Sequence, residues 1–218
     1  MEKFNMHIIL SAAISIDGKI STRSNDSKFS SKEDIIRLHK LRSKVDAILI
    51  GKNTLLRDDP LLTVRHTKGK NPVRIILDSK GTISKNSKII KTSDKIPTII
   101  AVSKKISKVN FSKLKKLPVE IIISGENSVN LKSLMTKLST KKIQTLLVEG
   151  GGTVNWEFIK NNIFDELIIT LSPYLIGGNN ATSLVEGNGF AKIINSPNLK
   201  LKSVKRLKNH LVINYIKV

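Results

Sequence analysis

A glycine turn is the segment of this sequence whose residue types most directly suggest ligand binding. Glu149-Gly150-Gly151-Gly152-Thr153 follows an apolar run and precedes a helical pattern. Glycine permits a sharp turn and a close approach of ligand to backbone, and the free amides of a helix N-terminus attract anions. The turn therefore suits a pyrophosphate. A tight turn without any ligand would explain the same residues, and the segment is not the G-x-G-x-x-G fingerprint.

A second polar segment, residues 51–65, combines carboxylates with arginine. Asp58 and Asp59 stand directly before Pro60, and Arg65 follows. Carboxylates can bind ribose hydroxyls, and a guanidinium binds a phosphate through two parallel hydrogen bonds. An ordinary Asp-Asp-Pro turn capped by its own side chains would have the same composition. Taken alone, this segment leaves both interpretations open.

Other kinds of catalytic site lack the residues they need. The sequence has no cysteine, which excludes disulfides, thiolate metal sites and a zinc deaminase signature. The histidines have no metal-ligand spacing, and neither a Gly-x-Ser-x-Gly nor a Walker motif occurs. We therefore expect no bound metal.

The elements that must position these residues follow from hydrophobic periodicity. Apolar runs predict strands at 7–15, 47–50, 73–77, 98–102, 119–123, 145–148 and 166–171. A capping-box start at Ser30, Ser31, Glu33 and Asp34 predicts one helix, the spacing of Leu131, Leu134, Met135 and Leu138 a second, and residues 154–161 a third. This alternation favours an α/β fold with three layers and a mostly parallel, doubly wound sheet.

The end of the chain has a different pattern. Residues 199–206 and 210–217 predict two strands of a C-terminal antiparallel hairpin. The lysine-rich residues 104–116 indicate a solvated helix or loop rather than a boundary. We expect a single domain over residues 1–218.

The formal net charge of +21 raises the question of nucleic-acid binding. The lysines are spread along the whole chain and only 4% of the residues are aromatic, so stacking platforms for single strands are scarce. We favour a solvated basic surface that attracts anionic ligands, with nucleic-acid binding as the alternative. The polar N-terminus and the lack of a long apolar run predict a cytoplasmic protein without a membrane partner.

Several motifs in order resemble the riboflavin-pathway pyrimidine reductase family, which shares the dihydrofolate reductase-like fold. They are Ser15-Ile16-Asp17-Gly18-Lys19, the block from Thr54 to Arg65 with its Asp-Asp-Pro-x-Leu-Thr-x-Arg pattern, Pro72–Ser79, Val148-Glu149-Gly150-Gly151, Asp165-Glu166-Leu167 and Ser172–Gly178. The resemblance covers nearly the whole chain. It is closest to the stand-alone archaeal and fungal type, so we expect another protein to carry out deamination.

The resemblance implies roles for individual residues. An NADPH site would be lined by Ala13, Thr54, Asp58 and Ser79, with the cofactor phosphates held by Gly151, Gly152, Thr153, Val154, Asn155 and Trp156. The substrate would be faced by Ser27, Arg42, Leu62, Arg65 and Glu149, with the arginines suited to its phosphate. Lys80, Lys104 and Lys105 are candidate cations for the cofactor 2′-phosphate.

The implied reaction is the NADPH-dependent reduction of 2,5-diamino-6-(ribosylamino)-4(3H)-pyrimidinone 5′-phosphate to its ribitylamino product. Opening of the ribose gives an imine that accepts a hydride, and Asp58, Glu149 or a water would assist the proton transfer. The alternatives are a reductase of the same fold that acts on the deaminated pyrimidine or on a pterin. We also expect a homodimer, as is common in the family.

Overall fold

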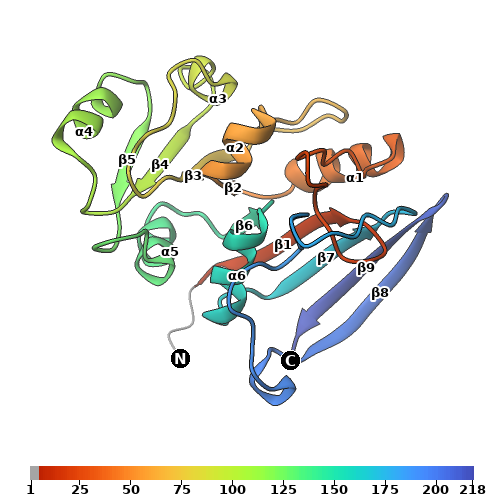
Figure 1. Ribbon diagram of the computed structural model, residues 1–218. Helices are drawn as coiled ribbons and strands as arrows, with labels where there is room; N and C mark the ends of the chain where they lie inside the picture. Colours follow the sequence, from red (N-terminus) through yellow and green to blue (C-terminus); the bar gives the residue numbers. More distant parts are fainter. Residues whose placement is uncertain (1–4) are drawn as a thin grey trace.

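The computed structural model describes residues 5–218, and within them nine strands form one sheet (Figure 1). The strands are β1 (His7–Ile14), β2 (Ala47–Gly51), β3 (Val73–Leu77), β4 (Thr98–Val102), β5 (Glu120–Ile123), β6 (Thr145–Val148), β7 (Glu166–Leu171), β8 (Leu199–Leu207) and β9 (His210–Lys217). Their order is β5-β4-β3-β2-β6-β1-β7-β9-β8.

The direction of the strands divides the sheet into two parts. The pairs from β5 to β7 are parallel, whereas β9 runs antiparallel to β7 and β8 runs antiparallel to β9. The predicted mostly parallel sheet with a C-terminal antiparallel hairpin is thus confirmed. Strand ends differ from prediction by a residue, for example at β5, which begins at Glu120.

Short helices connect the parallel strands. They are α1 (Lys32–Arg42), α2 (Lys52–Asp58), α3 (Lys88–Lys91), α4 (Lys108–Lys115), α5 (Leu131–Ser139) and α6 (Gly152–Lys160), and a short 3₁₀ turn, η1 (Ile193–Asn195), precedes β8. As predicted, α1 begins after Ser31, whose side chain accepts a hydrogen bond from the Asp34 amide. Helix α6 begins two residues before the predicted start because Gly151 already occupies its N-cap.

The helices cover both faces of the sheet. Helices α1 to α4 precede strands that step toward the β5 edge, and α5 and α6 precede strands that step back, so right-handed crossovers place the two groups on opposite faces (Figure 1). Strand β2 shows the consequence, since Ala47 and Leu49 pack into one core cluster and Ile48 and Ile50 into the other. Burial on both faces explains why the parallel strands are continuously apolar.

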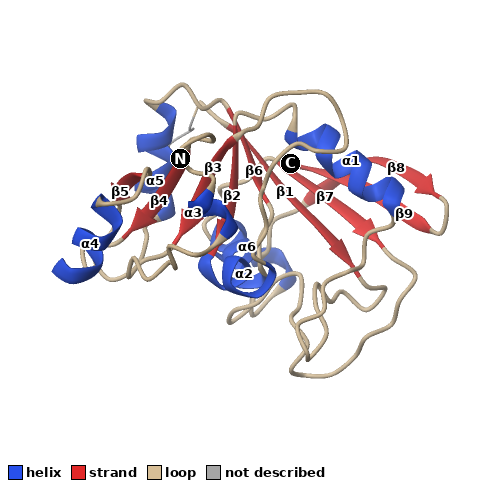
Figure 2. Ribbon diagram, turned by 90° about the horizontal axis from the view of Figure 1, so that it is seen from above, coloured by secondary structure: helices blue, strands red, loops and turns tan. Residues whose placement is uncertain are grey.

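The longest loops follow β1 and β7 and gather at the carboxyl ends of the strands (Figure 2). The two loops are joined by a bridge between Lys19 and Ser183. Within residues 5–218, no helix is both long and apolar enough to cross a membrane.

Candidate active site

The topology predicts where a ligand would bind. Strands β2 and β6 are neighbours, but the chain leaves them in opposite directions, toward β3 and toward β7. A sheet of this kind has a crevice beyond the carboxyl ends of two such strands. The glycine turn follows β6 and helix α2 follows β2 (Figure 2). Residues of both sequence segments with binding chemistry line one cavity at this position.

The larger of two cavities at this position has a volume of about 970 Å³. Its walls are the N-terminal turns of α2 and α6, the end of β3 and part of the loop after β7. The predicted cofactor residues that line it are Thr54, Ser79, Gly151, Gly152, Thr153 and Val154. The loop contributes Asn179, Asn180, Ala181, Thr182 and Glu186, which sequence reasoning missed.

The two helices that point at this cavity begin without a capping side chain. Gly151 is the N-cap of α6 and Gly51 is the N-cap of α2, and neither offers a side-chain oxygen. Helices α1, α4 and α5, in contrast, are capped by the side chains of Ser31, Ser107 and Asn130. The amides of the first turn of α6 are therefore left for an anionic ligand such as a pyrophosphate.

Glycine is required in this wall for steric reasons. A Cβ on Gly51 would lie 2.7 Å from Val154 Cγ2, and a Cβ on Gly152 would lie 2.5 Å from the Ser183 carbonyl oxygen and would also collide with Glu186. The amide of Gly151 donates to Thr54 Oγ1 over 2.9 Å and so ties the start of α6 to α2. The absence of side chains at Gly51 and Gly152 thus lets α2, α6 and the loop after β7 pack closely around the cavity.

The smaller cavity has a volume of about 140 Å³ and adjoins the larger one. Thr54, Arg57 and Gly151 line both. The predicted site residues in its wall are Ala13, Ser27, Thr54, Asp58, Glu149, Gly151 and Asn155. Its size suits a single heterocyclic ring, and its lining is rich in charged and hydroxyl side chains.

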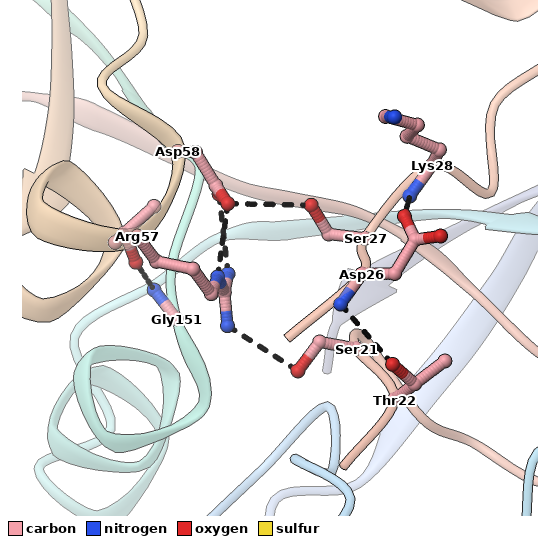
Figure 3. A network of polar contacts seen from close by, with 9 residues as sticks. Ser21, Thr22, Asp26, Ser27, Lys28, Arg57, Asp58 and Gly151 are labelled. Atoms are coloured by element: carbon pink, nitrogen blue, oxygen red, sulfur yellow. Dashed lines mark hydrogen bonds and ion pairs between the residues drawn. The ribbon is translucent and has the colours of Figure 1, made fainter. Parts of the chain in front are cut away.

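Asp58 is held in place by the preceding arginine. Arg57 donates from Nε to Asp58 Oδ1 over 3.0 Å and from Nη2 to Oδ2 over 3.2 Å (Figure 3). The third nitrogen of Arg57 reaches Ser21 Oγ at 3.3 Å, and Ser27 Oγ lies 3.4 Å from Asp58 Oδ1. These contacts fix Asp58 beside the wall that the two cavities share.

Glu149 is paired with Arg42 in the same two-pronged way. Arg42 Nε and Nη2 lie 2.8 and 2.7 Å from the two carboxylate oxygens, and Nη1 donates to the Thr63 carbonyl oxygen. The side chains of Arg42 and Glu149 are only 8% and 13% exposed. Burial alone would lower the pKa of Arg42, but the charge and hydrogen bonds of Glu149 outweigh it and raise this pKa.

A buried histidine lies next to this ion pair. His39 Nδ1 accepts the backbone N–H of Arg65 over 3.0 Å, and its ring packs edge-on against His66. Burial, with the charges of Arg42 and Arg65, lowers the pKa of His39 to about 4. His39 is therefore neutral at physiological pH.

Four predicted site residues lie outside the first layer of side chains around the cavities. Arg42 lies behind Glu149, and Arg65 is exposed and donates to Thr63 Oγ1 over 2.7 Å. Leu62 is 1% exposed and packs in the core, so its side chain is directed away from solvent. Trp156 stacks edge-on against Phe190, with 5.0 Å between ring centroids.

The residues of the small cavity that were missed as site residues include three polar ones from one segment of the chain. Ser30, Asp34 and Arg37 line it from the start of α1. In the sequence, Asp34 fits a helix-capping pattern, which explains it without a ligand. The sequence feature that could have drawn attention to this cluster is the pair Asp34 and Arg37, because an acid and a base three positions apart lie on one face of a helix.

Comparison with known proteins identifies the family. The model of the family described as RibD C-terminal domain matches residues 6–213. The chain belongs to the RibD C-terminal domain family. A relative from Aquifex aeolicus (strain VF5) is 38% identical over 202 residues, covering 90% of each chain, and is named 2,5-diamino-6-ribosylamino-4(3H)-pyrimidinone 5′-phosphate reductase. The predicted membership of a riboflavin-pathway reductase family is confirmed.

Solved structures of family members and of more distant proteins share the fold. The Thermotoga maritima diaminohydroxyphosphoribosylaminopyrimidine deaminase/5-amino-6-(5-phosphoribosylamino)uracil reductase has a TM-score of 0.81 at 26% identity, covering 98% of this chain and 57% of that one. Dihydrofolate reductase from Enterococcus faecalis, in a complex with NADP(H), has a TM-score of 0.56 at 12% identity, covering 98% and 97%. The dihydrofolate reductase-like fold is thus confirmed.

Proposed function

We propose that this protein uses NADPH to reduce the ribosylamino group of 2,5-diamino-6-(ribosylamino)-4(3H)-pyrimidinone 5′-phosphate to a ribitylamino group. The observation that carries the proposal is the pair of adjoining cavities that share Thr54, Arg57 and Gly151. A cavity of about 970 Å³ beside the uncapped start of α6 suits a dinucleotide, and the adjoining polar cavity of about 140 Å³ suits the ring of the substrate. The name of the Aquifex relative supports this choice of substrate.

The residues of the larger cavity fit NADPH. The first-turn amides of α6 would hold its pyrophosphate, and Lys52, which lines the cavity, adds a positive charge. Of the lysines predicted to bind the 2′-phosphate of the cofactor, Lys104 already forms an ion pair with Glu126, with 2.7 Å between Lys104 Nζ and Glu126 Oε1. When bound, the reduced nicotinamide supplies the hydride that the first carbon of the opened ribose accepts.

The carboxylates of the smaller cavity would orient the opened substrate. Asp58 and Glu149 are each fixed by an arginine, so their oxygens stand at defined positions in the cavity wall. Hydride addition at the imine carbon requires a proton at the imine nitrogen, and the product is a secondary amine. We propose that Asp58 or Glu149 assists this transfer, directly or through a water.

The biological unit that we propose is a cytoplasmic homodimer. In the apolar stripe of α1, Leu41 packs against the core of its own chain, whereas Ile35 is 36% exposed and available for a subunit contact. The mass of the protein in solution tests the dimer directly, and a monomeric mass would contradict it.

The catalytic proposal is tested by turnover. Purified protein is incubated with NADPH and the diaminated compound, and the loss of reduced-nicotinamide absorbance is followed. The deaminated compound and NADH are tested in parallel. We expect oxidation that depends on substrate and is faster with NADPH, and no oxidation with either pyrimidine would refute the function. Full turnover by Glu149→Gln would leave Glu149 a binding role only.

A further inference from the structure

A hydrogen-bond network centred on the buried carboxylate of Asp34, near the start of α1, forms part of the wall of the smaller cavity. Asp34 is 1% exposed. Its Oδ1 accepts hydrogen bonds from Arg37 Nε and Thr170 Oγ1, both at 2.7 Å, and its Oδ2 accepts one from Ser30 Oγ at 2.6 Å. Thr170 belongs to β7, whereas Ser30, Asp34 and Arg37 line the cavity.

This network keeps hydrogen-bonding capacity for a ligand. A carboxylate has about four acceptor positions, and the three contacts of Asp34 leave one on Oδ2. Ser30 gives its proton to Asp34, so its oxygen retains lone pairs as acceptors. Arg37 uses Nε for Asp34 and Nη2 for Thr170, which leaves Nη1 as a donor. The group thus offers two acceptors and one donor.

The two pyrimidines that could be the substrate differ in the pattern they present. On the diaminated compound the 2-amino group and N3–H donate and the 4-oxo group accepts. On the deaminated compound a 2-oxo group replaces the 2-amino group, so the first donor becomes an acceptor. An acceptor placed against acceptors loses a hydrogen bond and leaves a polar group unsatisfied.

We propose that Asp34, Ser30 and Arg37 read this edge of the pyrimidinone and select the diaminated substrate. The inference rests on the proposed function and specifies its substrate. Thr54, Arg57 and Gly151 form the wall shared with the larger cavity, where the ribose carbon must meet the cofactor. The α1 residues line the smaller cavity alone, so they would meet the ring at its other end.

A substitution that reverses one hydrogen-bonding group tests the proposal. Asp34→Asn replaces one carboxylate oxygen by an amide donor of the same shape. The measured quantity is the ratio of kcat/KM for the diaminated compound to kcat/KM for the deaminated one. We expect this ratio to fall by on the order of tenfold or more. Ser30→Ala, which removes one acceptor at a less buried position, is expected to lower the same ratio.

An aspartate away from the cavities serves as the control for the Asp-to-Asn substitution, although it is exposed where Asp34 is buried. Asp46 also accepts three hydrogen bonds, from Gln144 N, Thr145 N and Thr145 Oγ1, but lies away from both cavities, so Asp46→Asn should leave the ratio unchanged. If Asp34 only ties α1 to β7, both compounds lose activity equally. An unchanged ratio in the Asp34 and Ser30 variants would overturn the inference alone. If the unaltered protein turned over neither compound, the proposed function would be overturned as well.

Discussion

The ion pair between Arg42 and Glu149 provides the sharpest prediction about stability. Arg42→Met keeps the aliphatic stem but leaves a carboxylate that is 13% exposed without its cation. Two hydrogen bonds to Glu149 and one to the Thr63 carbonyl oxygen are lost together. Removal of one partner from a buried pair costs about 3–5 kcal/mol. For a chain of this length, the melting temperature should fall by roughly 6–20 °C.

The assay is thermal and urea unfolding followed by circular dichroism, for Arg42→Met, Glu149→Gln and the double variant. The double variant should be less destabilised than the sum of the single ones, because it leaves no unpaired charge. Lys104→Met serves as the control, since it breaks an exposed pair with Glu126 and should cost at most about 1 kcal/mol. A similarly small loss for Arg42→Met would refute the account of this site.

Two further substitutions test neighbouring features. The pKa of His39 is about 4 in the folded protein against an ordinary 6.5, so the unfolded chain binds the proton first. The resulting stabilisation is present above pH 6.5 and is lost toward pH 4, by up to about 1.4 kcal/mol per pH unit. The denaturation midpoint of His39→Gln should therefore fall less with decreasing pH than that of the unaltered protein. Parallel plots of midpoint against pH for the two proteins would contradict this. Gly152→Ala places a methyl group against the Ser183 carbonyl oxygen and Glu186, so KM for NADPH should rise several-fold. Gly189→Ala meets nothing within 4 Å but strains the backbone at φ +69°, so it should lower stability and leave KM for NADPH near its original value.

Local sequence patterns were sufficient to predict the parallel sheet. Ile48 and Ile50 face one core cluster while Ala47 and Leu49 face the other, and burial on both faces appears in the sequence as an unbroken apolar run. Helix α3 could not be predicted, because its four residues are too few to show a period. It is held instead by a distant contact, in which Asp59 Oδ1 accepts the Lys88 amide.

The candidate site was predicted only in part because its contacts are long-range. The glycine turn and Asp58 are visible as motifs, and the structure brings both to the same crevice. The pairing of Arg42 with Glu149 joins residues 107 positions apart, and no periodicity indicates it. The loop after β7 covers Gly152 with Ser183 and Glu186, and this contact likewise arises only from tertiary packing.

The most direct test of the account is the fate of the transferred hydrogen. Thr54, Arg57 and Gly151 line both cavities, so in the proposed function a nicotinamide bound in one would lie beside the opened ribose of a substrate in the other. With NADPH deuterated at nicotinamide C4, the account predicts one deuterium at the first carbon of the ribityl chain of the product, measured by mass spectrometry and NMR. A product without deuterium there, or with deuterium in the pyrimidine ring, would contradict it.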